Sequence, residues 1–130
     1  LDYYKVLFGL LNALKVDAVL MEYEDMFPYA NELGLLRRHN SYSVTELQSI
    51  LQLASDNNLE VIPLVQTFGH LEFVLKHQKY ASLREDPMKS DTVCPSDNSS
   101  WNLITEMLKQ VDDELNNTQL QNRSQRLLLT

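Results

Sequence analysis

One apolar run that ends in polar residues limits the architectures open to this chain. Residues 61–70 read VIPLVQTFGH, so an almost wholly apolar stretch gives way to Gln66, Thr67 and His70. A strand buried on both faces of a sheet reads as a continuous apolar run, because neither face meets water. Polar groups at the carboxyl end of such a strand lie where α/β sheets and α/β barrels bind their ligands. The segment therefore predicts a buried parallel strand and the edge of a site.

Three further segments carry apolar residues at helical spacing, and each begins at a residue that caps helices. Asp2 is the expected N-cap of the first helix, which runs through about residue 14. Ser43 and Glu46 form a capping box at the start of the second, which ends at Asn57. Ser99 or Ser100 caps the third, and a short helix is expected over residues 70–77. The residues expected to face the core are Leu7, Leu10, Leu11 and Leu14, then Leu47, Ile50, Leu51 and Ala54, then Leu103, Ile104, Met107, Leu108, Val111 and Leu115.

Strands are expected at residues 18–21, 61–65 and 126–130, in alternation with these helices. Residues 26–42 read as a long loop, 84–98 as an irregular segment and 116–124 as a polar link. Such alternation predicts parallel strands joined by right-handed crossovers. Two architectures fit, a small doubly wound α/β domain or part of a (β/α)8 TIM barrel. A whole barrel takes about 250 residues, so this chain of 130 residues supplies about half of one. Pro63 in the middle of a strand requires a bulge or a ladder position whose N–H is not needed.

Composition excludes several partners. The net charge of -7 and the lack of a Lys/Arg cluster argue against nucleic acid or an anionic membrane surface as main partner. No apolar run approaches the roughly 20 residues of a membrane span. Cys94 is alone, so a reducing compartment, cytoplasm or nucleus, is expected. The sequons at Asn98, Asn116 and Asn122 matter only in a secreted chain. The first residue, Leu1, and the final LLLT run suggest a fragment.

Two polar clusters follow successive strands and are expected at the same rim of a parallel sheet. Glu22, Glu24 and Asp25 follow one strand, and Gln66 and His70 follow the next. Carboxylates near an imidazole shift each other's pKa, which is what general acid–base catalysis requires. The alternative interpretation is that the carboxylates cap helices or pair with the basic pair at residues 37–38.

Other kinds of site find little support in the sequence. The three histidines, His39, His70 and His77, lack the spacing of a zinc site, so no metal is expected. No glycine-rich phosphate loop is present. Cys94 is expected to be a buried, inert thiol. The aromatic residues are assigned mainly to the core, although aromatic rings on site loops also stack on sugars; they are Phe27, Tyr29, Tyr42, Phe68 and Trp101.

At the two polar clusters the sequence resembles a known family. The segments MEYEDMFPY at residues 21–29 and VIPLVQTFGHLE at residues 61–72 closely resemble β-N-acetylhexosaminidases of glycoside hydrolase family 20. The likeness continues through FVLKH at 73–77 and YASLRE at 80–85, and it covers most of the chain with weaker matching in the last third. The two motifs are specific as a pair. No cofactor is implied.

The resemblance implies a (β/α)8 barrel and hydrolysis of terminal β-linked N-acetylglucosamine or N-acetylgalactosamine. In this family the substrate's own acetamido oxygen attacks the anomeric carbon, and a glutamic acid protonates the leaving oxygen. By resemblance, Asp25 and His70 form a supporting relay toward that acid, and Glu24 and Gln66 are neighbours of the substrate. Many members carry an acidic residue where this chain has Gln66.

The catalytic Asp–Glu pair of the family follows the fourth barrel strand, and this chain does not contain it. Residues 1–130 then form one N-terminal fragment of the barrel, from the first helix to the start of the fourth strand, and we expect no hydrolase activity from it alone. The expected partner is an N-acetylhexosamine-containing glycoside, with a homodimer of the full-length enzyme left open. The alternative function is a non-catalytic sugar-binding or scaffold α/β domain.

Overall fold

Three parallel strands form one sheet in the computed structural model, which describes residues 1–117 and 128–129. Their order follows the chain: β1 (Ala18–Glu22), β2 (Glu60–Val65) and β3 (Leu128–Leu129). Both pairings are parallel, as the alternation predicts. The remainder of the predicted third strand, and most of the polar link before it, lie outside the described residues. The structure is therefore mixed α/β with the predicted order of elements.

The pairing of β1 with β2 decides how Pro63 is accommodated. The register runs from Ala18↔Glu60 to Glu22↔Leu64 without interruption, and Pro63 lies opposite Met21. A bulge would place two residues opposite one, so the bulge interpretation is wrong. On its other side, β2 has described pairs only from Leu64 onward. The other expected accommodation therefore remains: Pro63 occupies a position of the β-ladder that requires no N–H donor.

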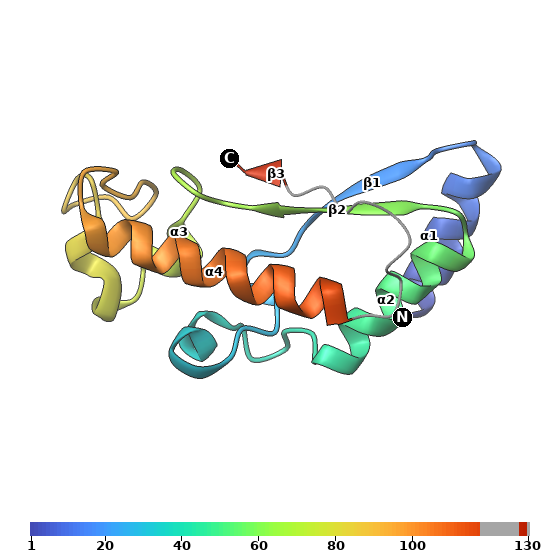
Figure 1. The fold of residues 1–130 in the computed structure, drawn as a ribbon, viewed down its shortest axis with the longest axis horizontal. Helices are drawn as coiled ribbons and strands as arrows, with labels where there is room; N and C mark the ends of the chain where they lie inside the picture. The colour runs from blue at the N-terminus through green and yellow to red at the C-terminus, as the bar shows by residue number, and fades with distance from the viewer. Residues whose placement is uncertain (118–127, 130) are drawn as a thin grey trace.

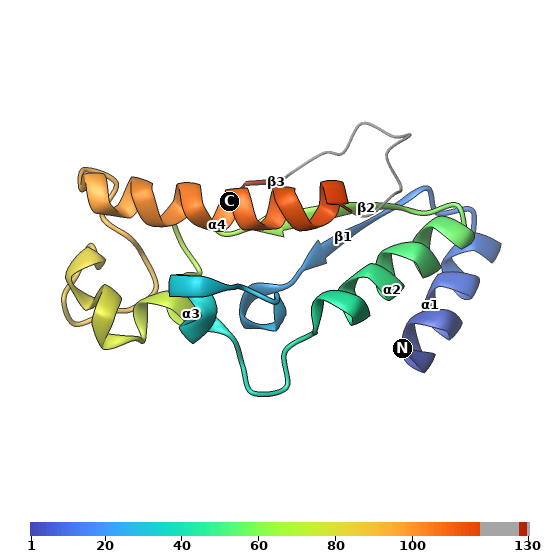
Figure 2. The ribbon, with the colours of Figure 1, turned by 60° about the horizontal axis from the view of Figure 1, so that its bottom comes forward.

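The described α-helices cover one face of this sheet (Figures 1 and 2). They are α1 (Asp2–Ala13), α2 (Val44–Asp56), α3 (Glu72–Leu75) and α4 (Asn98–Asn117). α2 connects β1 to β2, and α4 lies between β2 and β3. Val19, Met21 and Val61 pack against buried helix residues, whereas Leu20 is 52% exposed on the opposite face. Within the described residues, none of the helices is both long and apolar enough to cross a membrane.

The helix caps agree with the sequence at only one of three places. The Ser43–Glu46 capping box is present, since the Ser43 hydroxyl accepts from the Glu46 N–H and the Glu46 carboxylate accepts from the Ser43 N–H. The assignment of Asp2 as an N-cap is wrong, because Asp2 is inside the first turn and pairs with Lys5. Ser99 and Ser100 are not caps either; they lie inside α4. The cap there is Asp97, whose carboxylate accepts from the Ser99 N–H at 2.7 Å.

Removing the capping box should weaken α2. We expect Ser43→Ala to lower the free energy of unfolding by about 1 kcal/mol, because free N–H groups of the first turn lose their acceptor. Ser55→Ala, near the end of the same helix, is the matched control and should change it by less than about 0.5 kcal/mol. Urea unfolding followed by circular dichroism measures both, and equal losses would contradict a capping role.

The predicted long loop at residues 26–42 is more structured than the sequence suggests. It contains the last residue of one short 3-10 helix, η1 (Glu24–Met26), and the whole of a second, η2 (Asn31–Leu36). Its apolar side chains are buried in the larger core cluster, under α4 and the sheet: Phe27, Tyr29, Leu33 and Leu36. Because these residues follow no regular spacing, periodicity could not reveal them. A third 3-10 helix, η3 (Gln78–Leu83), follows α3.

The buried faces of the long helices were predicted well for α2 and α4 but poorly for α1, where Leu7 and Leu11 are only partly buried against the core. Leu47, Ile50, Leu51 and Ala54 are buried, as are the expected α4 residues apart from the partly buried Leu108. On α1 the fully buried residue is Phe8, packed near Ile50, Ala54 and Leu59. Leu10 and Leu14, expected in the core, are 54% and 66% exposed. α1 is apolar on more than one side, so spacing alone could not choose its buried face.

Candidate functional site

The carboxyl ends of β1 and β2 meet, and they bring the two predicted polar clusters together. Glu22 is the last residue of β1 and lies opposite Leu64. Gln66 follows two residues later and therefore lies on the same face of the sheet. Its side-chain amide donates a hydrogen bond to the Glu22 carboxylate. Gln66 is 4% exposed, so a buried amide holds an exposed carboxylate at this rim.

Asp25 is the buried carboxylate of the rim. It is 8% exposed, and its Oδ2 lies 3.3 Å from Arg38 Nε and 3.7 Å from Lys76 Nζ. The loop after η1 returns to the same place, since the Arg38 N–H donates to the Asp25 carbonyl at 2.9 Å. The ion pair with residue 37 or 38 that the alternative interpretation expects is thus present at Asp25. Within the described residues no hydrogen bond joins Asp25 to His70.

Glu24 and His70 both have an unusual backbone conformation. Their φ angles are 44° and 55°, in the left-handed region that side chains with a Cβ rarely adopt. Such strain is often found where a chain must present a side chain at a functional site. Glu24 is the first residue of η1, two residues after β1, and His70 lies in the connection between β2 and α3. Both residues are thus in the connections that follow the carboxyl ends of the two strands.

The environment of Glu24 raises its pKa. Partial burial is the main cause, and the negative charges of Glu22, Asp25 and Glu72 add to it, while His70 acts in the opposite direction. Glu24 and His70 are therefore close enough to interact electrostatically. A carboxylic acid with a raised pKa holds its proton to higher pH and can donate it in a hydrogen bond.

The Glu24 pKa makes a testable contribution to stability. Since the pKa is higher in the folded state, the contribution is complete below the unfolded value of 4.5 and is lost as pH rises through the folded pKa. Glu24→Gln should therefore raise the melting temperature at pH 7 by roughly 2 °C and leave it nearly unchanged at pH 4.

Glu46 supplies a control of opposite sign. Its pKa is lowered by hydrogen bonds from Ser43, so its contribution is present above the unfolded pKa and is lost as pH falls through the folded value. Glu46→Gln should lower the melting temperature at pH 7 and have less effect in acid. Melting curves of Glu24→Gln and Glu46→Gln at pH 7 and pH 4 test both expectations. If both substitutions shift the melting temperature at pH 7 in the same direction, the assigned pKa directions are wrong.

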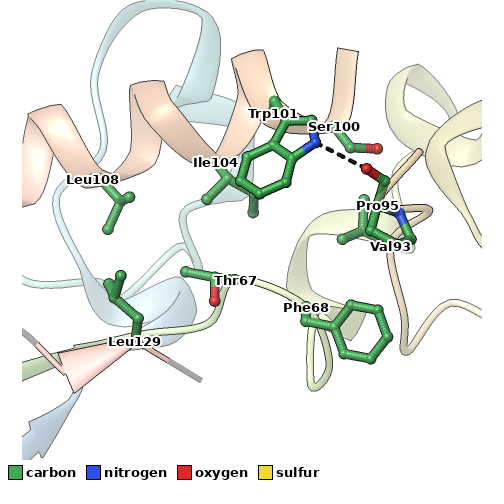
Figure 3. A pocket seen from close by; sticks show the side chains of 9 residues that line it. All are labelled: Thr67, Phe68, Val93, Pro95, Ser100, Trp101, Ile104, Leu108 and Leu129. Carbon is green, nitrogen blue, oxygen red and sulfur yellow. Dashed lines mark hydrogen bonds between the residues drawn. The ribbon is translucent and has the colours of Figure 1, made fainter. Parts of the chain in front are cut away.

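An apolar cavity of about 320 Å³ lies beside this rim, between the end of β2 and α4 (Figure 3). Trp101 and Phe68 face it and are 60% and 52% exposed, so their assignment to the core is wrong, whereas Phe27 and Tyr29 are buried as expected. Trp101 is held by a hydrogen bond from its Nε1 to the Pro95 carbonyl at 2.9 Å. The described residues that line it include no ionisable side chain: Thr67, Phe68, Val93, Pro95, Ser100, Trp101, Ile104, Leu108 and Leu129. The described part of the lining thus offers apolar contact surface and neither an acid nor a base.

The remaining candidates lie apart from the rim. His77 follows α3 and is the N-cap of η3, and burial and the charge of Lys76 lower its pKa. Among the described residues no group of three or more His, Cys, Asp or Glu side chains could hold a metal ion. Cys94 is a free thiol that is only partly buried, so its expected full burial is wrong. It follows Val93, which pairs with Arg84 in an isolated bridge.

Sequence reasoning missed Lys76 and the partnership of Glu22 with Gln66. Lys76 lies far from Asp25 in the chain, and only the packing of α3 beside η1 brings their charges together. The positions of Glu22 and Gln66 at two strand ends did carry a signal, because parallel pairing places such residues on one rim. The register that puts them on the same face required the structure.

The chain is similar in sequence to two curated hexosaminidases. It is 51% identical over 109 residues to hexosaminidase D of Bos taurus, a match that covers 84% of this chain and 32% of the relative. It is 50% identical over 110 residues to hexosaminidase D of Homo sapiens, covering 85% of this chain and 23% of the relative. The chain thus spans a third or less of the length of these relatives. No protein-family model matches it.

Solved structures agree with this resemblance at the level of the fold. A Streptomyces plicatus β-hexosaminidase in complex with its product is similar with a TM-score of 0.70 and 15% identity, over 87% of this chain and 27% of the enzyme. A family 20 β-N-acetylhexosaminidase of Streptomyces coelicolor gives a TM-score of 0.69 and 16% identity over the same shares. The resemblance stated from the two motifs is thereby confirmed, and the chain has the fold of a part of such enzymes.

Proposed function

We propose that this chain, which is similar to hexosaminidase D, supplies part of the active site of a β-N-acetylhexosaminidase. The observation that carries the proposal is the 51% identity over 109 residues. The substrate class is a glycoside with a terminal β-linked N-acetylglucosamine or N-acetylgalactosamine. The reaction is hydrolysis with retention, in which the acetamido oxygen of the substrate acts as the nucleophile.

The finer architecture proposed is a partial (β/α)8 barrel, from its first helix to the start of its fourth strand. Sequential parallel strands with helices on one face support it, because a barrel keeps its helices outside and packs side chains within. The helix-free face carries Leu20, Ile62 and Leu64, which are exposed or half-buried here. These are the side chains that would fill the interior of a closed barrel.

The proposed roles of the rim residues follow their positions. Asp25 and His70 support the general acid, and Glu24 and Gln66 are neighbours of the bound sugar. Arg38 and Lys76 hold the Asp25 carboxylate in place, so it can orient a neighbouring group. The raised pKa of Glu24 lets it donate to a sugar oxygen over a wider pH range. The general acid and the acetamido-orienting aspartate would come from outside residues 1–130.

A chimera tests the function. Human hexosaminidase D in which this chain replaces its matching segment should release nitrophenol from nitrophenyl N-acetyl-β-glucosaminide, because the rim and the catalytic pair are then in one molecule. Residues 1–130 alone should release none, since a glycosidase without its acid cannot protonate the leaving group. A chimera that melts cooperatively but shows no hydrolysis would refute the proposed function. Hydrolysis by residues 1–130 alone would refute the assignment of the catalytic pair to another segment.

A second candidate function is sugar binding without catalysis, and the cavity beside Phe68 and Trp101 favours it. Exposed aromatic faces next to a polar rim suit the apolar face of a pyranose ring. If this is the function, N-acetylglucosamine should bind residues 1–130 and quench Trp101 fluorescence, while the folded chimera stays inactive. Trp101→Phe should then abolish the fluorescence change.

A further inference from the structure

Glu22 differs from the other carboxylates of the rim in how it is held. Asp25 is paired with Arg38 and Lys76, whereas among the described residues no cation pairs with Glu22. Its one described hydrogen bond comes from the Gln66 amide, which is neutral. Within the described part of the chain, Glu22 thus has no ion-pair partner and accepts one hydrogen bond.

The Glu22 side chain projects from the helix-free face of the sheet. Glu22 follows Leu20 by two residues in β1, so both side chains project from the same face. Leu20 is 52% exposed on that face, and Glu22 lies above it at the carboxyl end of the strand. In an α/β barrel this is the end of the interior where the site opens. The carboxylate is thus placed where a substrate would arrive.

Gln66 fixes the orientation of this carboxylate. Its side chain is almost fully buried, so its position is set by packing, and its amide N–H donates to one oxygen of Glu22. An ionised carboxylate accepts at about four positions on two oxygens. Gln66 occupies one, and none of the other described residues donates to the remaining positions. Hydroxyl groups donate well to a charged acceptor, and a pyranose offers several of them.

We propose that Glu22 binds a ring hydroxyl of the terminal sugar and that Gln66 is its positioning residue. This inference rests on the proposed function and deepens it. Glu22 is a binding residue, and the substrate class it selects is a hexosamine with a free hydroxyl at the position it contacts. Gln66 lies beside the bound sugar and contributes to its binding by orienting Glu22. A carboxylic acid at position 66 could not replace Gln66 without adding a second negative charge beside Glu22.

Three variants of the active chimera test the proposal. Glu22→Gln keeps an acceptor for the Gln66 amide but removes the charge, and it should raise KM about tenfold or more, as loss of a charged hydrogen bond does. Gln66→Leu should raise KM by a smaller factor, because Glu22 remains but is no longer oriented. The exchanged pair Glu22→Gln/Gln66→Glu restores one hydrogen bond between the two positions. It should recover the melting temperature and leave KM high.

A purely structural role predicts a different result for the exchanged pair, namely recovery of both the melting temperature and KM. That outcome would overturn the inference. Deoxy substrates give a second test. Glu22→Ala should not raise KM further for the one analogue that lacks the contacted hydroxyl, because the substitution and the missing hydroxyl remove the same interaction. Equal effects of Glu22→Ala on the 3-, 4- and 6-deoxy analogues would also contradict it. If the parent chimera folds but is inactive, the proposed function is refuted. Failure of the proposed function is therefore distinguishable from failure of the inference about Glu22.

Discussion

Asp25→Asn in the chimera should lower kcat/KM by about 100-fold, the lower end of what acid–base catalysis contributes. The substitution keeps the volume of the side chain and removes the charge that Arg38 and Lys76 hold in place. Both cations are about half exposed, so they regain water, and the free energy of unfolding should fall by only about 1–2 kcal/mol. Steady-state kinetics and urea unfolding of the same preparation separate the two effects.

This experiment decides between the two interpretations of the Asp25 carboxylate. If Asp25 only ties the loop at 26–42 to α3, its loss should alter stability and leave kcat/KM within a few-fold of the parent. The matched control is Glu32→Gln, which breaks the exposed ion pair of Glu32 with Lys79 at 3.1 Å. Such surface pairs contribute about 0–1 kcal/mol, so neither quantity should change appreciably. A kcat/KM for Asp25→Asn that equals that of the control would remove Asp25 from the supporting relay.

Phe8→Ala should cost about 3–5 kcal/mol of the free energy of unfolding, which is the usual range for a buried aromatic ring. Phe8 is fully buried against Ile50, Ala54 and Leu59, and it joins α1 to α2. Single domains are stable by only about 5–15 kcal/mol, so residues 1–130 with this substitution should lose their cooperative melting transition. In the chimera the transition should survive at a lower temperature. An unchanged melting curve would contradict the placement of α1.

Leu10→Ala on the same helix is the matched control, and it also tests the proposed barrel. Leu10 is 54% exposed, and Val6, one turn before it, is 75% exposed. In residues 1–130 alone the substitution should change stability by less than about 0.5 kcal/mol. If the rest of a barrel covers this side of α1, the same substitution in the chimera should cost about 2 kcal/mol or more. Equal small effects in both would argue against the barrel.

Regular elements were the part of the fold that the sequence predicted well. The α4 face of Leu103, Met107 and Val111 and the Ser43–Glu46 capping box are confirmed because each depends on residues close in the chain. The 3-10 helices at 24–36 and the buried face of α1 were not predicted. In both places several arrangements of the same apolar residues are locally equivalent. Packing against α2, α4 and the sheet selects among them, and that contact is not local.

In the candidate site, too, features set by local sequence were predicted and features set by tertiary packing were not. From strand-end positions alone, the carboxylate cluster at 22–25 and the Gln66–His70 segment were expected at one rim, and the parallel pairing of β1 with β2 brings them there. The partners were not predictable. Lys76 reaches Asp25 only because α3 packs beside η1. Trp101 and Phe68 line one cavity only because the start of α4 lies near the segment that follows β2 (Figure 3).

The strand at 61–65 is less buried than predicted, since Val61, Ile62 and Leu64 are only partly buried. The sequence by itself determined that this run is a parallel strand whose polar end shares a rim with residues 22–25, and its two motifs indicated a family. These conclusions rest on patterns within short segments, where the physical cause is the removal of apolar side chains from water. Only the tertiary structure decided that Gln66 holds Glu22 and that Asp25 is neutralised by two cations. Those contacts join residues 13 to 51 positions apart, and their energies depend on distance and burial, which no local pattern contains.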